Sequence, residues 1–500
     1  MREPARLGIL AAMPPAPLAR ADALLGDAIE AAIKLHHRRR LRRLGHPGIL
    51  DPPPKPDLFA AGEPVPRPGC RLQVLVDGAT ALPAIAEAIR GARSHVHVTG
   101  WHLSAHFELV RGEHPVVLGE LLAEVAERVD VRVMVWAGAP VPVFHPTRKE
   151  VEAEVEKLVR DTKIRCFRDP REHPVHCHHE KTVVIDDEVA FVGGIDMTDL
   201  SGDRFDTSDH PARRKLGWHD VGTRLEGPVV ADVAEHFAMR WREVAGETLP
   251  PIVAPAPLTG ASTSTVQMVR TVADGMYDAV PTGDFRIMES YVRALRAAQR
   301  FVYLENQFLW SPEIVELLVD KLQHPPVPDF RLVVLLPANA NNGQDDTSGQ
   351  LGVLSEADDH GNPHFLATTI RSRTGHRDDP LYVHAKVGIV DDRWMTIGSA
   401  NINSHSLLND TEMNVVTDDA ALARATRERL WAEHLEIDAA QIAGLDPIEA
   451  IDGHWRPIAV EQLRRRKAGE PPTHRLIALP GVSKRSRRLL GPLQELVDDG

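Results

Sequence analysis

The chain has 500 residues, more than one ordinary hydrophobic core organises, so we expect several domains or fused halves. Hydrophobic residues make up 43% of it and charged residues 26%, a balance that excludes a largely disordered protein. The formal net charge of −13 argues against a dedicated nucleic-acid-binding protein, because phosphate contacts dominate that affinity and require a basic surface.

The cysteines and the N-terminus indicate a cytoplasmic protein. Cys70, Cys166 and Cys177 are widely spaced and odd in number, which is not the pattern of a disulfide framework or a metal site. The apolar start of the chain is short and is interrupted by Pro14 and Pro15, so we expect no secretory signal. No apolar run approaches the roughly 18 residues that span a bilayer. We therefore predict a cytoplasmic protein that can lie at the periphery of a membrane.

The first predicted element is a helix over residues 22–44 that ends in a basic run, HHRRRLRR. A Pro-rich stretch follows it, and we interpret residues 1–68 as an N-terminal helical segment with a linker. Strand-like and helix-like segments then alternate, which predicts an α/β fold. These segments are a strand at 72–76, a helix at 83–92, a strand at 95–99, a helix at 116–129 and a strand at 131–136.

An internal repeat sets the predicted architecture. AIRGARSHVHVTGW, residues 88–101, is similar to ALRAAQRFVYLENQ, residues 294–307, at an offset of 206. Two chemically distinctive motifs, described next, repeat at an offset of 205. Two independent segments at nearly one offset indicate a tandem duplication.

We therefore predict two homologous α/β halves, residues 69–250 and 264–460, with central mixed sheets packed about a pseudo-twofold axis. The stretch between them is rich in Pro, Ala, Thr and Ser, which is typical of a linker. A basic C-terminal tail is predicted over residues 461–500. The two basic ends of the chain are typical of solvated helix faces, and they also suit attraction to anionic lipid.

Each duplicated motif carries residues suited to phosphate chemistry. A histidine is followed two positions later by a lysine and five further on by an aspartate, and a turn of small residues follows after six intervening residues. Both copies keep the same spacing. They are His179, Lys181 and Asp186 with Gly193-Gly194-Ile195-Asp196, and His384, Lys386 and Asp391 with Gly398-Ser399-Ala400-Asn401.

The spacing of the His-x-Lys motif has a physical explanation. We expect each His-x-Lys on a strand, where alternate side chains share a face, so the imidazole and the ammonium point the same way. An imidazole can act as nucleophile or acid at phosphorus, and an ammonium neutralises phosphate oxygen. One such pair is usually a solvated surface feature. Two copies at one spacing, each followed by a small-residue turn, favour a functional site.

This pair of motifs resembles the signature of the phospholipase D superfamily, and the resemblance covers residues from about 70 to 460. FVGGIDMTDLSGDRFDT (191–207) and GWHDVGTRLEGP (217–228) look like the segments that follow the first motif in eukaryotic-type phospholipases D. YLENQFL (303–309) and IGSANINSHS (397–406) resemble the second half. Asp196 stands where many members carry Asn, which leaves open whether it touches substrate.

The resemblance implies a mechanism. His179 would attack phosphorus and form a phosphohistidine, while His384 would protonate the leaving alcohol and then activate water or an acceptor alcohol. Lys181, Lys386 and Asn401 would bind the non-bridging oxygens. Ser399 and Asp196 are further candidates at the phosphate, and Asp186 and Asp391 would hold the ends of strands.

The family's orienting acids come from the opposite half. By resemblance they match Asp220, expected to face His384, and Glu412, expected to face His179. The family chemistry uses no metal or cofactor, so we expect none. The histidine cluster at 173–179 and the acids from Asp196 to Asp206 then represent loops rather than ion sites.

The expected function is a phospholipase D-type phosphodiesterase or phosphatidyltransferase acting on phospholipid at a membrane surface, with no obligate protein partner. The alternative within the superfamily is a nuclease, which would need a basic groove with exposed aromatic rings, although aromatic residues are only 5% of the chain. A non-catalytic lipid-binding scaffold is a third hypothesis. Two intact motifs argue against it.

Overall fold

The structure is a computed structural model that describes residues 16–55, 57–140, 145–173, 176–338, 344–358 and 363–479. The outer parts of the two predicted terminal segments, 1–15 and 480–500, lie outside the described residues. Within the described ranges, no helix is both long enough and apolar enough to cross a membrane.

The first half is built on a mixed sheet. Three neighbouring strands, β6, β5 and β2, are parallel, and the antiparallel strands β7, β8, β10 and β1 continue the sheet from β2. In spatial order the strands are β6 (Arg165–Asp169), β5 (Asp130–Trp136), β2 (His95–Gly100), β7 (Thr182–Ile185), β8 (Val189–Gly193), β10 (Val221–Glu226) and β1 (Arg67–Val76).

The second half repeats this sheet strand by strand, with the same directions at every pairing. The mixed α/β fold predicted from the sequence is therefore confirmed. In the corresponding order the strands are β15 (Phe365–Thr374), β14 (Arg331–Leu335), β13 (Phe301–Glu305), β17 (Val387–Val390), β18 (Trp394–Gly398), β19 (Glu412–Thr417) and β11 (Ser264–Val272).

The halves join along equivalent strands. β1 pairs antiparallel with β11, with Arg67 opposite Val266. A second junction pairs β9 (Gly217–His219) of the first half with β16 (Arg377–Val383) of the second. Antiparallel pairing of equivalent strands is the pattern that an approximate twofold relation generates.

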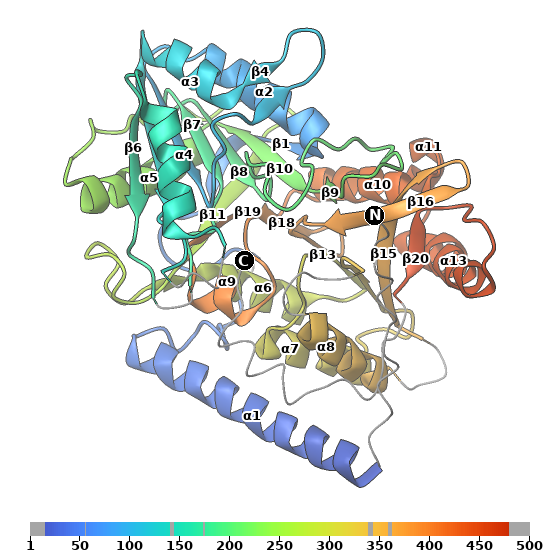
Figure 1. Cartoon of the computed structure of the whole chain (residues 1–500). Helices are drawn as coiled ribbons and strands as arrows, with labels where there is room; N and C mark the ends of the chain where they lie inside the picture. The colour runs from blue at the N-terminus through green and yellow to red at the C-terminus, as the bar shows by residue number, and fades with distance from the viewer. Residues whose placement is uncertain are drawn as a thin grey trace.

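Helices cover the outer faces of both sheets (Figure 1). Figure 1 shows α2 and α3 at one end of the molecule and α7 and α8 toward the other, with α1 lying beyond them. The helices of the first half are α2 (Gly78–Arg90), α3 (Leu118–Ala126), α4 (Arg148–Val159) and α5 (Val229–Ala245). Those of the second half are α6 (Arg286–Ala297), α7 (Pro312–Gln323), α8 (Gln344–Ala357), α9 (Ser404–Leu408), α10 (Ala420–Leu435), α11 (Ala439–Ala443), α12 (Pro447–Ala450), the π-helix η1 (Ile451–Trp455) and α13 (Arg456–Ala468). The remaining short strands are β3 (Glu108–Val110), β4 (Val116–Val117), β12 (Asp284–Phe285) and β20 (Leu476–Ala478).

One hydrophobic core extends across the junction between the two halves. Val221 and Val229 of the first half and Met268 of the second belong to a single buried cluster. Trp431 in α10 and Trp455 in η1 are completely buried in the same cluster. Because apolar burial holds the two sheets together, the residues between them are held in one rigid frame.

The N-terminal segment packs against the second half. Helix α1 (Ala16–Arg43) begins earlier than the sequence predicted, and the Nδ1 atom of His37 lies 2.7 Å from the Glu313 carboxylate on α7. The predicted linker is packed as well. The backbone N–H and C=O of Ala60 both bond the side-chain amide of Gln267 in β11. This segment therefore satisfies polar groups of the second sheet, and its role as a linker stays a prediction.

The predicted C-terminal tail also begins inside the fold. Residues 461–468 complete α13, and β20 pairs antiparallel with β15. Two of the basic residues on α13, Arg464 and Arg465, form ion pairs with Glu461. Much of this basic charge is therefore neutralised locally.

The aspartate of each His-x-Lys motif sits in a tight turn between two strands. Asp186 and Asp187 have φ of 55° and 56°, and Asp391 and Asp392 have φ of 53° and 50°. Both central residues are left-handed, which is the geometry of a type I′ turn and tolerates Asp. From this position Asp186 accepts hydrogen bonds from the backbone N–H groups of Arg93, Ser94 and His95, and Asp391 from those of Gln299, Arg300 and Phe301.

Asp186→Ala should lower the free energy of unfolding by about 1–3 kcal/mol, because the backbone donors at the start of β2 lose their acceptor. Asp187→Ala is the matched control, since it makes the same change at a left-handed position but removes only a contact with the ring of His95. Urea unfolding of the two variants measures the difference. Equal destabilisation by both would contradict an anchoring role for Asp186.

Candidate active site

The two His-x-Lys segments lie just before strands rather than within them. β7 begins at Thr182 and β17 at Val387, one residue after the lysine of each motif. The expected strand is therefore displaced, and the reason is visible in the hydrogen bonds. The motif backbone has left its own sheet to bond the opposite half.

These backbone bonds are reciprocal. The N–H groups of His179 and Glu180 donate to the Thr411 carbonyl at 2.9 and 3.0 Å. Those of His384 and Ala385 donate to the His219 carbonyl at 2.8 and 3.2 Å. Each motif is thus held by the residue that immediately precedes a carboxylate in the other half.

That carboxylate meets the histidine. The Nδ1 atom of His179 lies 2.9 Å from Glu412 Oε1, and that of His384 lies 2.6 Å from Asp220 Oδ2. The two imidazole centroids are 6.4 Å apart. With Nδ1 occupied by an acid, the Nε2 atom of each ring is left for chemistry.

The two carboxylates are supported differently. A Cβ on Gly194 would lie 2.2 Å from Asp220 Oδ1, so only glycine fits at that position. Its equivalent in the second half is Ser399, whose hydroxyl donates to the Glu412 carboxylate. Ser399 is fully buried. Its hydroxyl therefore supports Glu412, and a contact between Ser399 and the phosphate stays a prediction.

Both lysines are buried beside the histidines. The ammonium of Lys181 donates to the His179 carbonyl at 2.7 Å and lies 3.5 Å from Asp196 Oδ2. The ammonium of Lys386 donates to the His384 carbonyl and, at 3.2 Å, to the side-chain carbonyl of Gln307. Two cationic groups therefore flank the paired rings.

Asp196 and Asn401 occupy equivalent positions and line the same pocket. Each is buried, and each has a side-chain oxygen, Oδ1, without a hydrogen-bond partner. Unsatisfied buried polar atoms are rare unless a ligand or water completes them. The pair is therefore suited to contact a bound polar group.

Several pocket residues escaped the sequence analysis. Arg204 is 3% exposed, and its guanidinium carbon lies 3.5 Å from the centroid of the Trp218 ring, which in turn packs 4.5 Å from His384. Trp101 and Gln307 are the last aligned pair of the sequence repeat. Their equivalent positions in the two halves could therefore have been used to predict that both line the pocket. The pocket is lined by Trp101, His145, Cys177, His179, Asp196, Ser201, Arg204, Trp218, Gln307, Phe308, His384, Asn401 and Ser406.

Burial and crowding of charge control protonation in the pocket. Burial, with help from Lys181, lowers the pKa of Lys386 to about 7. Burial and the nearby cations, Lys386 first, hold the pKa of His384 well below its usual value. Burial also raises the pKa of Asp220 to about 6. The groups of the pocket therefore disfavour additional positive charge, and a bound anion would offset this effect.

Of the histidines and aspartates in the two loops, His179 and Asp196 line this pocket. His178 bonds Thr411, and His173 bonds the Asp274 carbonyl. Asp199 bonds Ser104, whereas Asp203 pairs with Arg111. Most of these side chains therefore serve separate local contacts.

Two histidines with carboxylates on Nδ1 and lysines beside them define a paired His/Lys centre of the kind suited to phosphate esters. A family model described as "Phospholipase D" matches residues 88–217 and 212–315, and one described as "Cardiolipin synthase, PLD-like domain" matches residues 291–433. The chain belongs to the phospholipase D superfamily.

Curated relatives carry the same name. Phospholipase D A of Dictyostelium discoideum is 26% identical over 469 residues, covering 73% of this chain and 35% of its own length. Phospholipase D1 of Schizosaccharomyces pombe is 26% identical, covering 74% and 36%. Phospholipase D2 of Bos taurus is 26% identical, covering 71% and 50%. The chain thus spans about a third to a half of these relatives.

Two solved structures are also similar. Phosphatidylserine synthase of Haemophilus influenzae aligns with a TM-score of 0.47 at 14% identity, covering 72% of this chain and 85% of that one. Polyphosphate kinase of Porphyromonas gingivalis aligns with a TM-score of 0.42 at 12% identity, covering 73% and 50%.

The lowered pKa of Lys386 predicts how anion binding depends on pH. Dibutyl phosphate keeps one negative charge, and it should bind best when Lys386 is protonated. Its affinity should therefore fall by up to about tenfold per pH unit above about pH 7. Isothermal titration calorimetry between pH 6 and 9 measures this.

Lys386→Gln should bind more weakly and lose the pH dependence, whereas Lys157→Gln, an exposed lysine paired with Glu154, should retain it. A Lys386→Gln profile that still falls above pH 7 would assign the titration to another group.

Proposed function

We propose that this chain is a phospholipase D-type phosphodiesterase that hydrolyses glycerophospholipids or transfers their phosphatidyl group to an alcohol. The observation that carries the proposal is the pair of imidazoles whose centroids lie 6.4 Å apart, each with a carboxylate on Nδ1. Attack and protonation on opposite sides of one phosphorus require two such groups within reach of it. The names of the curated relatives support the same activity.

In the first step, the Nε2 lone pair of His179 forms a bond to phosphorus while the bond from phosphorus to the leaving alcohol oxygen breaks. His384 gives its Nε2 proton to that oxygen. In the second step, water or an acceptor alcohol gives a proton to His384 and attacks phosphorus, which displaces His179. Each step conserves charge and protons, and the enzyme ends in its starting state.

The electrostatics of the pocket suit this order of events. His384 must be protonated to act as an acid, yet burial and neighbouring cations lower its pKa in the empty pocket. A phosphodiester brings one negative charge, which offsets the repulsion from Lys181, Lys386 and Arg204. Substrate binding would therefore load the proton that the first step uses.

The carboxylates would keep each imidazole in the correct tautomer and orientation. Lys181, Lys386 and Asn401 would hold the non-bridging oxygens, with Asp196 beside Lys181. Because each histidine takes its acid from the other half, we propose that residues 69–250 and 264–460 work only as one unit.

A lipid substrate is favoured over nucleic acid by two features. The net charge is −13, whereas a cleft that holds a polyanion needs a basic face. Aromatic rings at the pocket, Trp101, Trp218 and Phe308, suit a partly apolar substrate. The exposed arginines of α1, at positions 38, 39, 42 and 43, would supply contacts to an anionic membrane surface.

The two histidines should be separable by labelling. His179→Ala should abolish both turnover and the covalent phosphohistidine, because it removes the nucleophile. His384→Ala should block a lipid substrate but still form the phosphohistidine with a nitrophenyl phosphodiester, whose leaving group needs no proton. Acid quench followed by phosphohistidine detection measures this. His106→Ala, an exposed histidine outside the pocket, is the control.

Labelling of His179→Ala but not of His384→Ala would reverse the two roles. Loss of turnover in both with no labelling in wild type would contradict a covalent mechanism.

The substrate class should be revealed by one competition. The protein is incubated with vesicles of labelled phosphatidylcholine and phosphatidylglycerol, and separately with single-stranded DNA at equal phosphodiester concentration, each with and without ethanol. We expect turnover of phospholipid, formation of phosphatidylethanol when ethanol is present, and little DNA cleavage. DNA cleavage without phospholipid turnover would instead identify a nuclease.

A further inference from the structure

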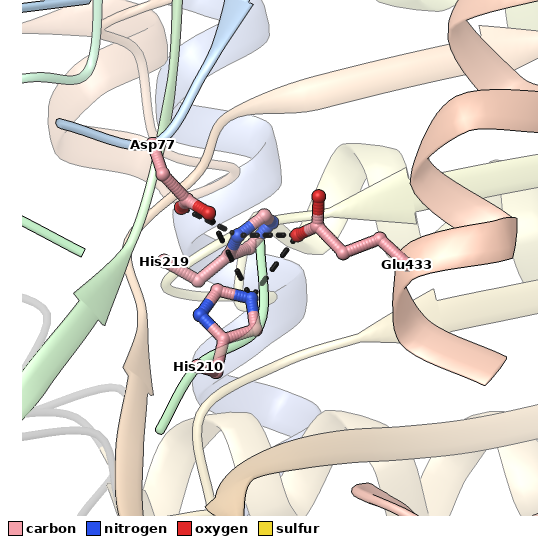
Figure 2. Close-up of side chains that lie close together, drawn as sticks. All are labelled: Asp77, His210, His219 and Glu433. Atoms are coloured by element: carbon pink, nitrogen blue, oxygen red, sulfur yellow. Dashed lines mark hydrogen bonds and ion pairs between the residues drawn. The ribbon is translucent and has the colours of Figure 1, made fainter. Parts of the chain in front are cut away.

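A second cluster of histidines and carboxylates lies behind Asp220, away from the pocket. Figure 2 shows Asp77, His210, His219 and Glu433 converging on one point. Their side chains are 0–4% exposed. Asp77 follows β1, His219 ends β9, and Glu433 lies on α10 of the other half. Neither the sequence motifs nor the proposed reaction uses this cluster.

The ligand atoms are spaced as a metal ion would require. His210 Nε2 lies 3.1 Å from Glu433 Oε1 and 3.8 Å from Asp77 Oδ2. His219 Nδ1 lies 3.6 Å from Glu433 Oε1 and 2.9 Å from Asp77 Oδ1. The four distances run from 2.9 to 3.8 Å, with Asp77 facing His210 through Oδ2 and His219 through Oδ1. Ligands about 2.0–2.1 Å from a tetrahedral Zn²⁺ are roughly 3.3 Å from one another, which lies within that range.

Each histidine also lies close to a further carboxylate. The other ring nitrogen of His219, Nε2, lies 3.1 Å from Glu305 Oε2. The other ring nitrogen of His210, Nδ1, lies 3.3 Å from Asp206 Oδ2. A carboxylate on the far nitrogen is the usual support of a metal-bound imidazole, because it fixes the tautomer and turns the remaining lone pair toward the ion.

The carboxylates of the cluster favour a bound cation. Asp77 Oδ2 is buried without a hydrogen bond and points into the cluster (Figure 2). Asp77 and Glu433 each bring a carboxylate to the cluster. A divalent cation bound between the four side chains would balance the charge of both.

We propose that Asp77, His210, His219 and Glu433 bind one structural Zn²⁺. Two nitrogen donors and two carboxylates at tetrahedral spacing suit zinc, whereas Ca²⁺ and Mg²⁺ take mainly oxygen ligands. All four positions are taken by protein and the cluster is closed to solvent. The ion therefore has a structural role and no open position for catalysis.

This ion would stabilise the position of Asp220, the acid on the Nδ1 atom of His384. The Asp220 N–H donates to Asp77 Oδ1 at 3.2 Å, and the Asp77 N–H donates to the Asp220 carbonyl at 2.8 Å. The His219 carbonyl accepts the N–H of His384 at 2.8 Å. A ligand from α10 would add a bond across the joint of the halves.

The test is the metal content of the full chain, purified without a histidine tag from cells grown with zinc. Wild type should contain about one zinc per chain by inductively coupled plasma mass spectrometry. His210→Gln combined with Glu433→Gln should contain less than about a tenth of that. His236→Gln should keep its zinc, since it removes a comparably buried histidine paired with Glu180 outside the cluster.

If the double variant does not fold, wild type decides the matter. Protein unfolded with a chelator and refolded with Co²⁺ should show the intense visible bands of tetrahedral cobalt. Zinc-free wild type that also shows no cobalt bands would overturn the proposal and leave two imidazolium ions holding the cluster. Metal content is measured without substrate, so this result is independent of the proposed phospholipase activity.

Discussion

The arrangement of the site depends on one exchange between the two halves. Each His-x-Lys segment leaves its own sheet, bonds a backbone carbonyl of the opposite half, and receives on its histidine the carboxylate that follows that carbonyl. Neither half supplies both the histidine of a His-x-Lys segment and the acid on its Nδ1 atom. The shared hydrophobic core and the β1–β11 pairing therefore serve the chemistry directly, since any slippage between the sheets would separate histidine from acid.

The sequence predicted the parts of this arrangement that repeat. The two α/β halves with mixed sheets and the paired motifs follow from a duplication visible in residues 88–101 and 294–307, whereas the order of the strands came only from the structure. The places where the halves differ could not be predicted in the same way. The position of Ser399 in the motif predicts a contact with phosphate. Only the tertiary structure shows that its hydroxyl donates a hydrogen bond to Glu412.

The packing of the linker segment could not be predicted for a related reason. Proline-rich composition is typical of a linker, but it does not reveal that Gln267 offers both a donor and an acceptor to Ala60. The buried cluster around His219 was invisible too, since its members are far apart in sequence and come from both halves. Local patterns predict local structure, whereas contacts between distant segments depend on tertiary packing.

The difference between Gly194 and Ser399 has a consequence for the history of the chain. In a symmetric dimer of identical subunits, one gene would specify both positions, so both histidines would have carboxylates in the same surroundings. Fusion into a single polypeptide removes that constraint. Asp220 now sits against a bare glycine and Glu412 against a hydroxyl donor, so the two imidazoles are chemically distinguishable before any substrate arrives. A division of labour between them can then be inherited.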